Sequence, residues 1–304
     1  MELHLIVNET AGNGQGKKRS NAIQQQLHVP YYLHITHYSK HAQLIVEDIA
    51  ASTKQALVIA IGGDGTINEV IGAARHFPQL VVGVIAAGSG NDFSRAYPTF
   101  ETAADIERYL QAPEQSLFDY GTISGLAQPY GFVNNSGVGF DAYVAIQANE
   151  STLKKRLNKW ALGKLSYIYF VMVGLFRFKP FTLHVQTAHE KKTYEHVWFA
   201  TVSNQPYFGG GMKLSPTSNM QDKQLELTVV HNLPKFKFLL LFGTVFFGKH
   251  TSIRGVVQQT SNAFQLQLEN PQPMHTDGEK VLLQQASTLT FQVAEQKWQL
   301  AQKK

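Results

Sequence analysis

The sequence predicts an α/β domain built on a parallel sheet, followed by a β-rich domain. Two apolar runs, residues 57–61 and 80–86, each end in a glycine-rich turn and lead into a helical pattern, which is typical of buried parallel strands. After about Gly125 the apolar residues fall in short runs separated by polar turns, which favours antiparallel sheet. A chain of 304 residues, 43% of them hydrophobic, is long enough for two domains with their own cores.

The first domain is predicted to begin with a strand at residues 3–7. The glycine-rich segment 11–18 resembles two known phosphate loops without satisfying either pattern, and a flexible basic loop explains it at least as well. A short strand at 31–36 and a helix at about 41–51 come next, followed by the two buried strands, each with a helix after it. This alternation places both turns at the carboxyl ends of neighbouring strands, where open α/β sheets bind ligands.

The second domain is predicted from short apolar runs at residues 182–186, 194–202, 225–230, 263–268 and 289–293. Two longer apolar segments, residues 152–178 and 235–250, are expected to be helices that cover the sheet and join its strands. Alternatively, they contact anionic lipid headgroups, because cations stand beside aromatic residues in both segments. These cations are Lys154, Lys155, Arg156, Lys159, Arg177, Lys179, Lys235 and Lys237.

The turn after the first buried strand carries the strongest local signal; it consists of Gly62, Gly63, Asp64, Gly65 and Thr66. Glycines at a strand-to-helix turn leave backbone N–H groups free at the positive end of a helix dipole, which suits phosphate oxygens. Thr66 and Glu69 have the spacing of a capping box. Asp64 would repel a phosphate unless a divalent cation lies between them or the carboxylate accepts a proton. A plain Asp-Gly turn is the alternative interpretation.

The composition narrows the possible partners and compartment. A net charge of +5 favours anionic partners such as nucleotides, acidic membrane surfaces or nucleic acid. The chain has no cysteine, which excludes disulfides and thiolate metal sites and fits a reducing compartment. The first residues lack the basic segment of a signal peptide, and the longest apolar stretch, residues 238–247, is too short to span a bilayer. We therefore expect a cytoplasmic protein.

Four motifs follow one another along the chain: residues 62–66 (GGDGT), 88–95 (GSGNDFSR), 135–141 (NSGVGFD) and 276–279 (TDGE). Together they resemble the diacylglycerol kinase catalytic-domain family, which is similar to sphingosine and ceramide kinases. The resemblance covers nearly the whole chain. It implies a nucleotide-binding α/β domain like that of NAD kinases and phosphofructokinases, a β-sandwich domain, and a cleft between them. The expected division is 1–125 for the first domain and 126–294 for the second, with residues 295–304 returning to the first.

The resemblance also implies roles for individual residues. The nucleotide contacts of the family match Asn8, Thr36, Gly62, Gly63, Asp64, Gly65, Thr66, Asn68, Ser89 and Asn91. The proton acceptor of the family matches Asp277, with Glu279 beside it. Its structural magnesium loop matches Asn219, Asp222 and Gln224, the outer two through their backbone carbonyls, although Lys223 stands where the family usually has glycine.

Phosphoryl transfer to an alcohol requires a carboxylate that accepts the hydroxyl proton. Asp277 and Glu279 are two residues apart, so in an extended segment both carboxylates would point to the same face. A plain hairpin turn is the alternative interpretation of this segment. We predict that Asp277 is the base, that Glu279 supports it or shares a metal ion, and that Asp64 binds magnesium and phosphate. Asp64 as the base is a second hypothesis.

Two further segments each allow two interpretations. The run Gly209, Gly210 and Gly211 is either a loop of close approach at the domain boundary or a flexible turn. Residues 135–137 either line the cleft or form an Asn-rich turn.

The sequence thus predicts an ATP- and Mg²⁺-dependent lipid kinase that phosphorylates the hydroxyl of diacylglycerol or a related membrane lipid. The expected partners are ATP and a membrane lipid, with peripheral membrane contact and no nucleic acid. Exposed strand edges in a β-rich domain would allow a homodimer. The alternatives are a soluble-metabolite kinase of the NAD kinase type and a non-catalytic lipid-binding regulator on the same fold.

Overall fold

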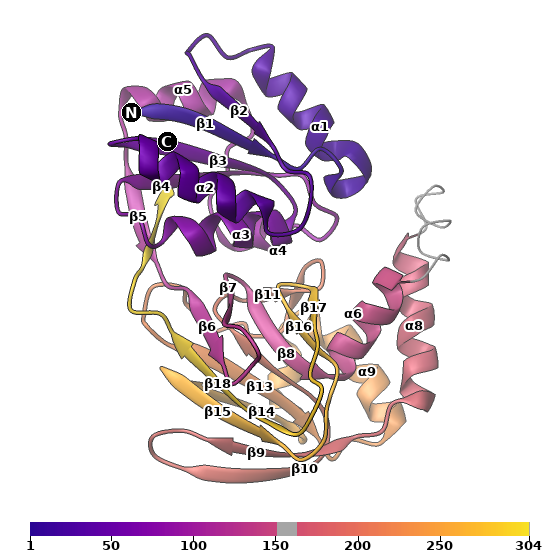
Figure 1. Cartoon of the computed structure of the whole chain (residues 1–304). Coiled ribbons are helices and arrows are strands. Elements are labelled where there is room, and N and C mark those ends of the chain that lie inside the picture. Colours follow the sequence, from indigo (N-terminus) through magenta and orange to yellow (C-terminus); the bar gives the residue numbers. More distant parts are fainter. Residues whose placement is uncertain (151–162, 304) are drawn as a thin grey trace.

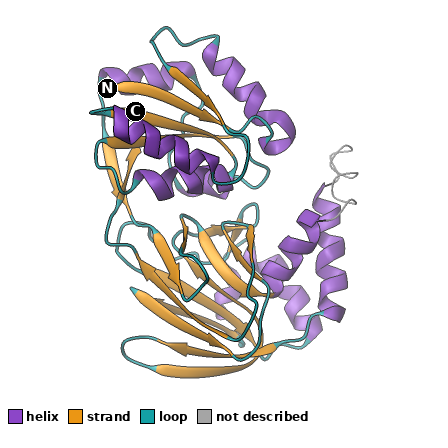
Figure 2. Ribbon diagram, in the orientation of Figure 1, coloured by secondary structure: helices purple, strands orange, loops and turns teal. Residues whose placement is uncertain are grey.

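The structure, a computed structural model, describes residues 1–150 and 163–303 (Figure 1). It contains a mostly parallel sheet flanked by helices and a larger, curled antiparallel sheet with helices along one flank (Figure 2). The predicted fold class, an α/β domain followed by a β-rich domain, is confirmed.

The first sheet has the strand order β2-β1-β3-β4-β19-β5. Neighbouring strands pair in parallel except β19 and β5, which are antiparallel. The last strand of the chain inserts between β4 and β5 and so completes the sheet that the first residues begin. The strands are β1 (Glu2–Val7), β2 (Tyr32–Ile35), β3 (Ala56–Gly62), β4 (Leu80–Ala86), β5 (Gln115–Phe118) and β19 (Trp298–Ala301).

Both faces of this sheet are buried under helices. Along β3, Val58 and Ala60 pack into a core with α2 and α3, while Leu57 and Ile59 pack into the opposite core with α1 and α5. This two-sided burial explains why the strand is apolar at every position. The helices are α1 (Ala11–Gln24), α2 (His41–Ser52), α3 (Asp64–Ala74), α4 (Asp92–Ala96) and α5 (Ala103–Gln111).

The second sheet curls around a core of its own. Its main path is β17-β16-β8-β10-β9-β15-β18-β6-β7, with β13 beside β10 and β14 beside β13. β10 pairs with β9 along its first half and with β8 and β13 along its second half. The strands are β6 (Gly121–Ser124), β7 (Tyr130–Phe132), β8 (Asn135–Gly139), β9 (Phe181–Gln186), β10 (Lys191–Ser203), β13 (Leu225–His231), β14 (Val256–Ser261), β15 (Ala263–Leu268), β16 (Met274–Thr276), β17 (Glu279–Val281) and β18 (Ser287–Val293). A separate short hairpin joins β11 (Tyr207–Phe208) and β12 (Met212–Lys213).

Helices cover one flank of the second sheet and form a third core with it. The Trp198 ring stacks on Phe238 at a centroid distance of 4.3 Å, which fixes α9 against β10. These helices are α6 (Phe140–Glu150), α8 (Gly163–Arg177), α9 (Lys235–Val245) and the short 3₁₀ helix η1 (Lys249–Ser252). Among residues 1–150 and 163–303, no helix combines the length and the apolar character that crossing a membrane requires.

Most predicted elements are confirmed. The strands expected at 31–36, 182–186, 194–202, 225–230, 263–268 and 289–293 correspond to β2, β9, β10, β13, β15 and β18. The helices expected at 41–51 and 235–250 correspond to α2, and to α9 with η1. The helix expected at 152–178 is confirmed from residue 163 onwards as α8. Residues 151–162, and with them Lys154, Lys155, Arg156 and Lys159, lie outside the described residues.

Two segments differ from the prediction. The flexible basic loop, one of the interpretations considered for residues 11–18, is wrong, because this segment opens α1 with left-handed backbone at Gly12, Asn13 and Gly14. A Cβ on Gly12 would collide with the Ala87 carbonyl, so this turn packs against the end of β4. The Asn-rich turn considered for residues 135–137 is also wrong, because they belong to the buried strand β8.

Candidate active site

The two glycine-rich turns lie side by side at the carboxyl ends of β3 and β4. Gly62 is paired with Ala86, and the Ala87 amide donates to the Gly62 carbonyl at 2.7 Å. A Cβ on Gly88 would lie 2.7 Å from the Cα of Gly63, closer than packed atoms tolerate. Glycine is therefore required at this crossing, and the edge of the sheet presents backbone rather than side chains, as a phosphate-binding turn needs.

Asp64 begins α3 and faces the start of α4. Its Oδ1 accepts a hydrogen bond from the Phe93 amide at 3.2 Å. A Cβ on Gly90 would lie 3.4 Å from Oδ2, which places this carboxylate between the two turns. Burial raises the pKa of Asp64, and backbone N–H donors, Phe93 foremost, partly oppose that rise.

The predicted capping box at the start of α3 is wrong. The helix already begins at Asp64, so Thr66 lies within its first turn, where the Thr66 hydroxyl accepts a hydrogen bond from the side-chain amide of Asn8 at 3.0 Å. Glu69 caps a different helix, because its Oε1 accepts from the Lys40 amide at 2.7 Å, at the start of α2. The tertiary fold thus supplies Glu69 with a partner outside its own helix.

Other residues predicted to contact the nucleotide lie at the same edge of the sheet. Asn8 follows β1, Thr36 follows β2, and Ser89 and Asn91 follow β4. Ser89 is exposed, whereas the Thr36 hydroxyl donates to the Val7 carbonyl at 3.3 Å. The structure therefore brings these residues together around the two turns.

Asn68 differs from the other predicted nucleotide contacts, because it links the two domains. Its side-chain amide donates to the Gly131 carbonyl at 3.0 Å, and its Oδ1 accepts from the Tyr120 hydroxyl at 3.0 Å. The two polar ends of the Asn68 side chain thus contact the second sheet at β7 and the segment between β5 and β6.

Asp277 lies in the turn of the β16–β17 hairpin. Asp277 and Gly278 have φ values of +44° and +83°, so the hairpin interpretation is confirmed and the extended segment is wrong. The Asp277 carboxylate is buried and accepts three backbone hydrogen bonds. Oδ1 accepts from Asn134 and Asn135, each at 2.9 Å, and Oδ2 accepts from Val133 at 2.8 Å.

Glu279 carries this hairpin into contact with the first domain. A Cβ on Gly65 would collide with Oε1 of Glu279, so the carboxylate lies directly against the glycine turn. Figure 1 shows the β16–β17 hairpin at the end of the second sheet that faces α3 and α4. The hairpin geometry, rather than a shared strand face, brings Asp277 and Glu279 to the domain interface.

The carboxylates at this interface share an electrostatic environment. Burial raises the pKa of Asp277 to about 7; its three backbone donors oppose this rise, and the charge of Asp64 adds to it. Burial raises the pKa of Asp92 to about 6, again with a contribution from Asp64. Burial also raises the pKa of Glu279, and nearby Glu69 adds to that rise. This acidic cluster is suited to a positively charged ligand.

The carboxylates at this interface fit a magnesium ion that is bound jointly by the protein and by the phosphates of a nucleotide. Among residues 1–150 and 163–303, no three acidic or histidine side chains are close enough to enclose a metal ion by themselves. Mg²⁺ is commonly held by one or two carboxylates together with substrate phosphates, and not by a cage of protein ligands alone. Asp64, between the two turns, is the carboxylate placed for that role.

Asp92 was not among the site residues predicted from the sequence, but in the structure it binds a loop of the other domain. It is 8% exposed, and its Oδ1 accepts from the amides of Gly210 and Gly211 at 3.0 and 2.8 Å. The run Gly209 to Gly211 is therefore a loop of close approach between the domains. The available signal was the position of Asp92 at the end of the second glycine-rich motif.

The residues matched to a structural magnesium loop have other partners. Asn219 Oδ1 accepts from the Gln221 amide at 3.1 Å, and Asp222 Oδ1 accepts from the Gln224 amide at 2.9 Å. The ammonium group of Lys297 lies beside the loop and donates to the Gln221 carbonyl at 3.3 Å. The loop in this form does not fit a divalent ion, because the ammonium charge of Lys297 already contacts it and one side-chain oxygen each of Asn219 and Asp222 is engaged by a backbone amide.

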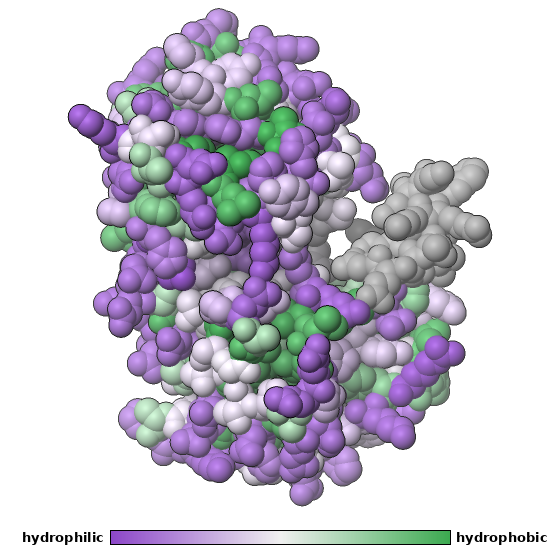
Figure 3. All heavy atoms as spheres, viewed as in Figure 1, coloured by the Kyte–Doolittle hydropathy of each residue, from purple (hydrophilic) through white to green (hydrophobic). Residues whose placement is uncertain are grey.

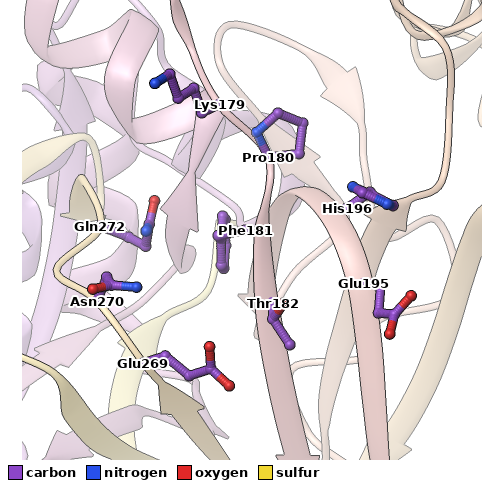
Figure 4. Close-up of a pocket in the computed structure, with 9 residues that line it drawn as sticks. All are labelled: Lys179, Pro180, Phe181, Thr182, Glu195, His196, Glu269, Asn270 and Gln272. Carbon is purple, nitrogen blue, oxygen red and sulfur yellow. The ribbon is translucent and has the colours of Figure 1, made fainter.

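A pocket of about 610 Å³ lies away from these carboxylates (Figure 4). It opens at the start of β9 and at the irregularity in the middle of β10, and it is bounded by the segment between β15 and β16; Asp64, Asp92, Asp277 and Glu279 do not line it. The residues that line it are Lys179, Pro180, Phe181, Thr182, Glu195, His196, Glu269, Asn270 and Gln272. We assign it no part in the candidate active site.

Comparisons with known proteins agree with this arrangement. The diacylglycerol kinase catalytic domain family matches residues 2–121, and the family of YegS C-terminal NAD kinase beta sandwich-like domains matches residues 135–293. The chain is 33% identical over 285 residues to the Bacillus subtilis protein named "Putative lipid kinase YtlR", covering 90% of this chain and 92% of that protein. It is 26% identical over 289 residues to a diacylglycerol kinase of Bacillus subtilis, covering 90% and 88%.

A solved structure shares the fold. The "Crystal structure of a putative diacylglycerol kinase from Bacillus anthracis" matches with a TM-score of 0.74 at 19% identity, covering 98% of this chain and 94% of that one. With both domains matched in order, this chain belongs to the diacylglycerol kinase catalytic-domain family and carries the YegS-type β-sandwich C-terminal domain.

Proposed function

We propose that the protein is an ATP- and Mg²⁺-dependent kinase that transfers the γ-phosphate to the hydroxyl of diacylglycerol or a related membrane lipid, in a cleft between its two domains. One observation carries this proposal. The hairpin that holds Asp277 and Glu279 meets the glycine turn of the other domain at Gly65. A proton acceptor and a phosphate-binding turn are thereby brought together, as phosphoryl transfer to an alcohol requires.

The first domain supplies the nucleotide site. Backbone N–H groups of the two turns, at the positive end of α3, bind phosphate oxygens. Asp64 would hold Mg²⁺ together with those oxygens, and the ion would neutralise charge on the transferred group. Asn8 and Ser89 border the same edge of the sheet and contribute polar contacts to the nucleotide.

Asp277 acts as the general base. Its ionised carboxylate takes the proton of the lipid hydroxyl as that oxygen bonds to the γ-phosphorus, and the bond from phosphorus to the bridging oxygen of ADP breaks. The pKa of about 7 leaves Asp277 largely ionised in mildly alkaline solution and gives it appreciable basicity. Glu279 lies against the turn and positions the groups that meet there. In the rival assignment, Asp64 takes the proton.

A small apolar cavity of about 20 Å³ lies within the core between the second sheet and its helices, and it is too small for a hydrocarbon chain. Phe208 and Met212 flank the glycine loop that Asp92 holds, and both line this cavity. The other lining residues come mainly from α6, β10 and α9; they are Phe140, Asp141, Val144, Phe199, Leu214, Leu241 and Val245.

Helices α8 and α9 support peripheral contact with a membrane. Phe176 is 70% exposed on α8, and Phe236 is 80% exposed on α9. The Lys235 ammonium lies 5.2 Å from the centroid of the Phe176 ring, so a cation accompanies the exposed aromatics. Figure 3 shows hydrophobic and hydrophilic side chains mixed on the flank that α8 occupies in Figure 1. Such a surface suits anionic headgroups over an acyl layer.

The decisive experiment offers labelled ATP and Mg²⁺ with vesicles that contain single candidate lipids, and with NAD as a soluble acceptor. Labelled phospholipid is the expected product. Label found only in phosphorylated NAD would favour the soluble-metabolite kinase. Binding to anionic vesicles without any labelled product would favour the non-catalytic regulator.

The membrane contact has its own test. Replacing Phe236 with serine should weaken binding to anionic vesicles about tenfold or more, because burial of a Phe side chain contributes roughly 1.5–3 kcal/mol. Leu44→Ser, at an exposed leucine of α2, is the matched control and should bind as the unaltered protein does. Equal vesicle affinity of both variants would contradict this surface.

A further inference from the structure

A buried ion pair joins the two segments by which the chain crosses between its sheets. Asp119 lies between β5 and β6 and is 0% exposed, and Lys297 directly precedes β19. The Lys297 ammonium lies 2.7 Å from Oδ1 of Asp119. The Trp298 indole donates to the Asp119 carbonyl at 3.2 Å and ties the same two segments a second time.

The loop of residues 219–224 closes over this pair. Its Lys223 amide donates to Oδ2 of Asp119 at 2.7 Å, and its Met220 carbonyl accepts from the Asp119 amide at 2.8 Å. Its Gln221 carbonyl accepts from Lys297 at 3.3 Å. Oδ2 of the buried carboxylate thus accepts a hydrogen bond from the loop, whereas Oδ1 accepts none from the part of the chain that the structure describes and is paired only with the charge of the Lys297 ammonium.

An ammonium group occupies the space beside Oδ1 of Asp119, at 2.7 Å. Mg²⁺ requires oxygen ligands at about 2.0–2.1 Å in a near-octahedral set, whereas an ammonium group donates at about 2.7–3.0 Å. A buried carboxylate needs one positive partner, and Lys297 provides it at 21% side-chain exposure. A divalent ion at the same place would meet the ammonium charge at close range.

We infer that the Lys297 ammonium takes the position in which the family resemblance implies a structural magnesium ion, so that the loop 219–224 and the domain connection hold together without a divalent metal. The left-handed backbone at Lys223, with φ of +61°, lets the loop turn its amide to Asp119. The matched residues Asn219, Asp222 and Gln224 then serve to shape the loop. This assignment concerns the domain connection and is independent of turnover.

The test is thermal unfolding of the full chain without nucleotide or lipid, in EDTA and in millimolar MgCl₂, with bound metal measured by mass spectrometry after dialysis. The melting temperature should be the same in both solutions, and no stoichiometric magnesium should be retained. Repeating both measurements with Asp64→Asn separates any weak binding at the nucleotide site. One retained magnesium ion per chain in that variant, or a melting temperature that depends on magnesium, would overturn the inference.

Variants of the pair extend the test. Lys297→Met should lower the melting temperature by about 6 °C or more, because it leaves a buried carboxylate without its partner. Lys191→Met, at an exposed lysine of β10, is the matched control. The double variant Lys297→Met with Asp119→Asn should recover part of the lost melting temperature, because it removes the uncompensated carboxylate. If Lys297→Met alone does not fold, the double variant can still be compared with the unaltered protein. A Lys297→Met variant as stable as the control would refute the role of the ammonium.

Discussion

Replacing Asp277 with asparagine tests the proposed base with little change in shape. The amide oxygen can keep both hydrogen bonds that Oδ1 accepts from Asn134 and Asn135. The amide nitrogen cannot accept the bond that Oδ2 takes from Val133, so one buried N–H loses its partner. Loss of a positioned general base slows a reaction by roughly 10²–10⁴-fold, and kcat should fall by that order.

The same substitution has a pH-dependent effect on stability. The pKa of Asp277 rises from 3.8 to about 7 on folding, so the folded protein holds this proton more tightly and loses stability as pH rises from about 4 to about 7. Above that range the loss is on the order of 4 kcal/mol, whereas the unpartnered N–H of the variant costs about 1–3 kcal/mol at every pH. Asp277→Asn should thus be less stable than the unaltered protein at pH 4 and at least as stable at pH 8.

The assays are turnover of labelled ATP on diacylglycerol vesicles at pH 8, and denaturant unfolding at several pH values from 4 to 8. Asp48→Asn, at an exposed carboxylate of α2, is the control for charge removal away from the site. Turnover by Asp277→Asn close to that of the control would refute its role as the base. A stability difference that does not change with pH would refute the raised pKa.

Three further substitutions probe the rest of the site. Asp64→Asn should weaken binding of ATP with Mg²⁺ while leaving binding of ATP alone unchanged or stronger, as calorimetry would show; unchanged magnesium dependence would instead favour Asp64 as the base. Asp92→Ala removes the carboxylate that holds the Gly210 amide, so hydrogen exchange at that amide should accelerate at least tenfold, and unchanged protection would contradict the clamp. Gly65→Ala should displace the Glu279 carboxylate and lower turnover. The double variant Gly65→Ala with Glu279→Ala should lose no more turnover than the more impaired single variant, and fully additive losses would argue against a contact between the two residues.

Structural features whose determinants lie close together in the sequence were predicted from the sequence alone. The buried strands β3 and β4 follow from uninterrupted apolar runs, and the turns after them follow from glycines at the ends of those runs. The α/β and β-rich order of the domains follows from the same local patterns. The position of Asp64 in a glycine-rich turn between a strand and a helix could be predicted, because all of its determinants lie within a few residues.

Partnerships between distant segments were decided only by the tertiary structure. Asp277 receives its hydrogen bonds from amides more than 140 residues away, and Asp92 binds a loop 118 residues further on. Glu69 has the spacing of a capping box with Thr66, yet it caps α2, because packing of the helices offers it free amides there. Likewise, the cation beside the loop 219–224 is a lysine from the end of the chain. Periodicity in the sequence indicates which face of a helix or strand is buried, but it does not indicate which distant hydrogen-bond donor contacts that face. The partners of the carboxylates at the site could therefore be assigned only from the packing of the two domains against each other.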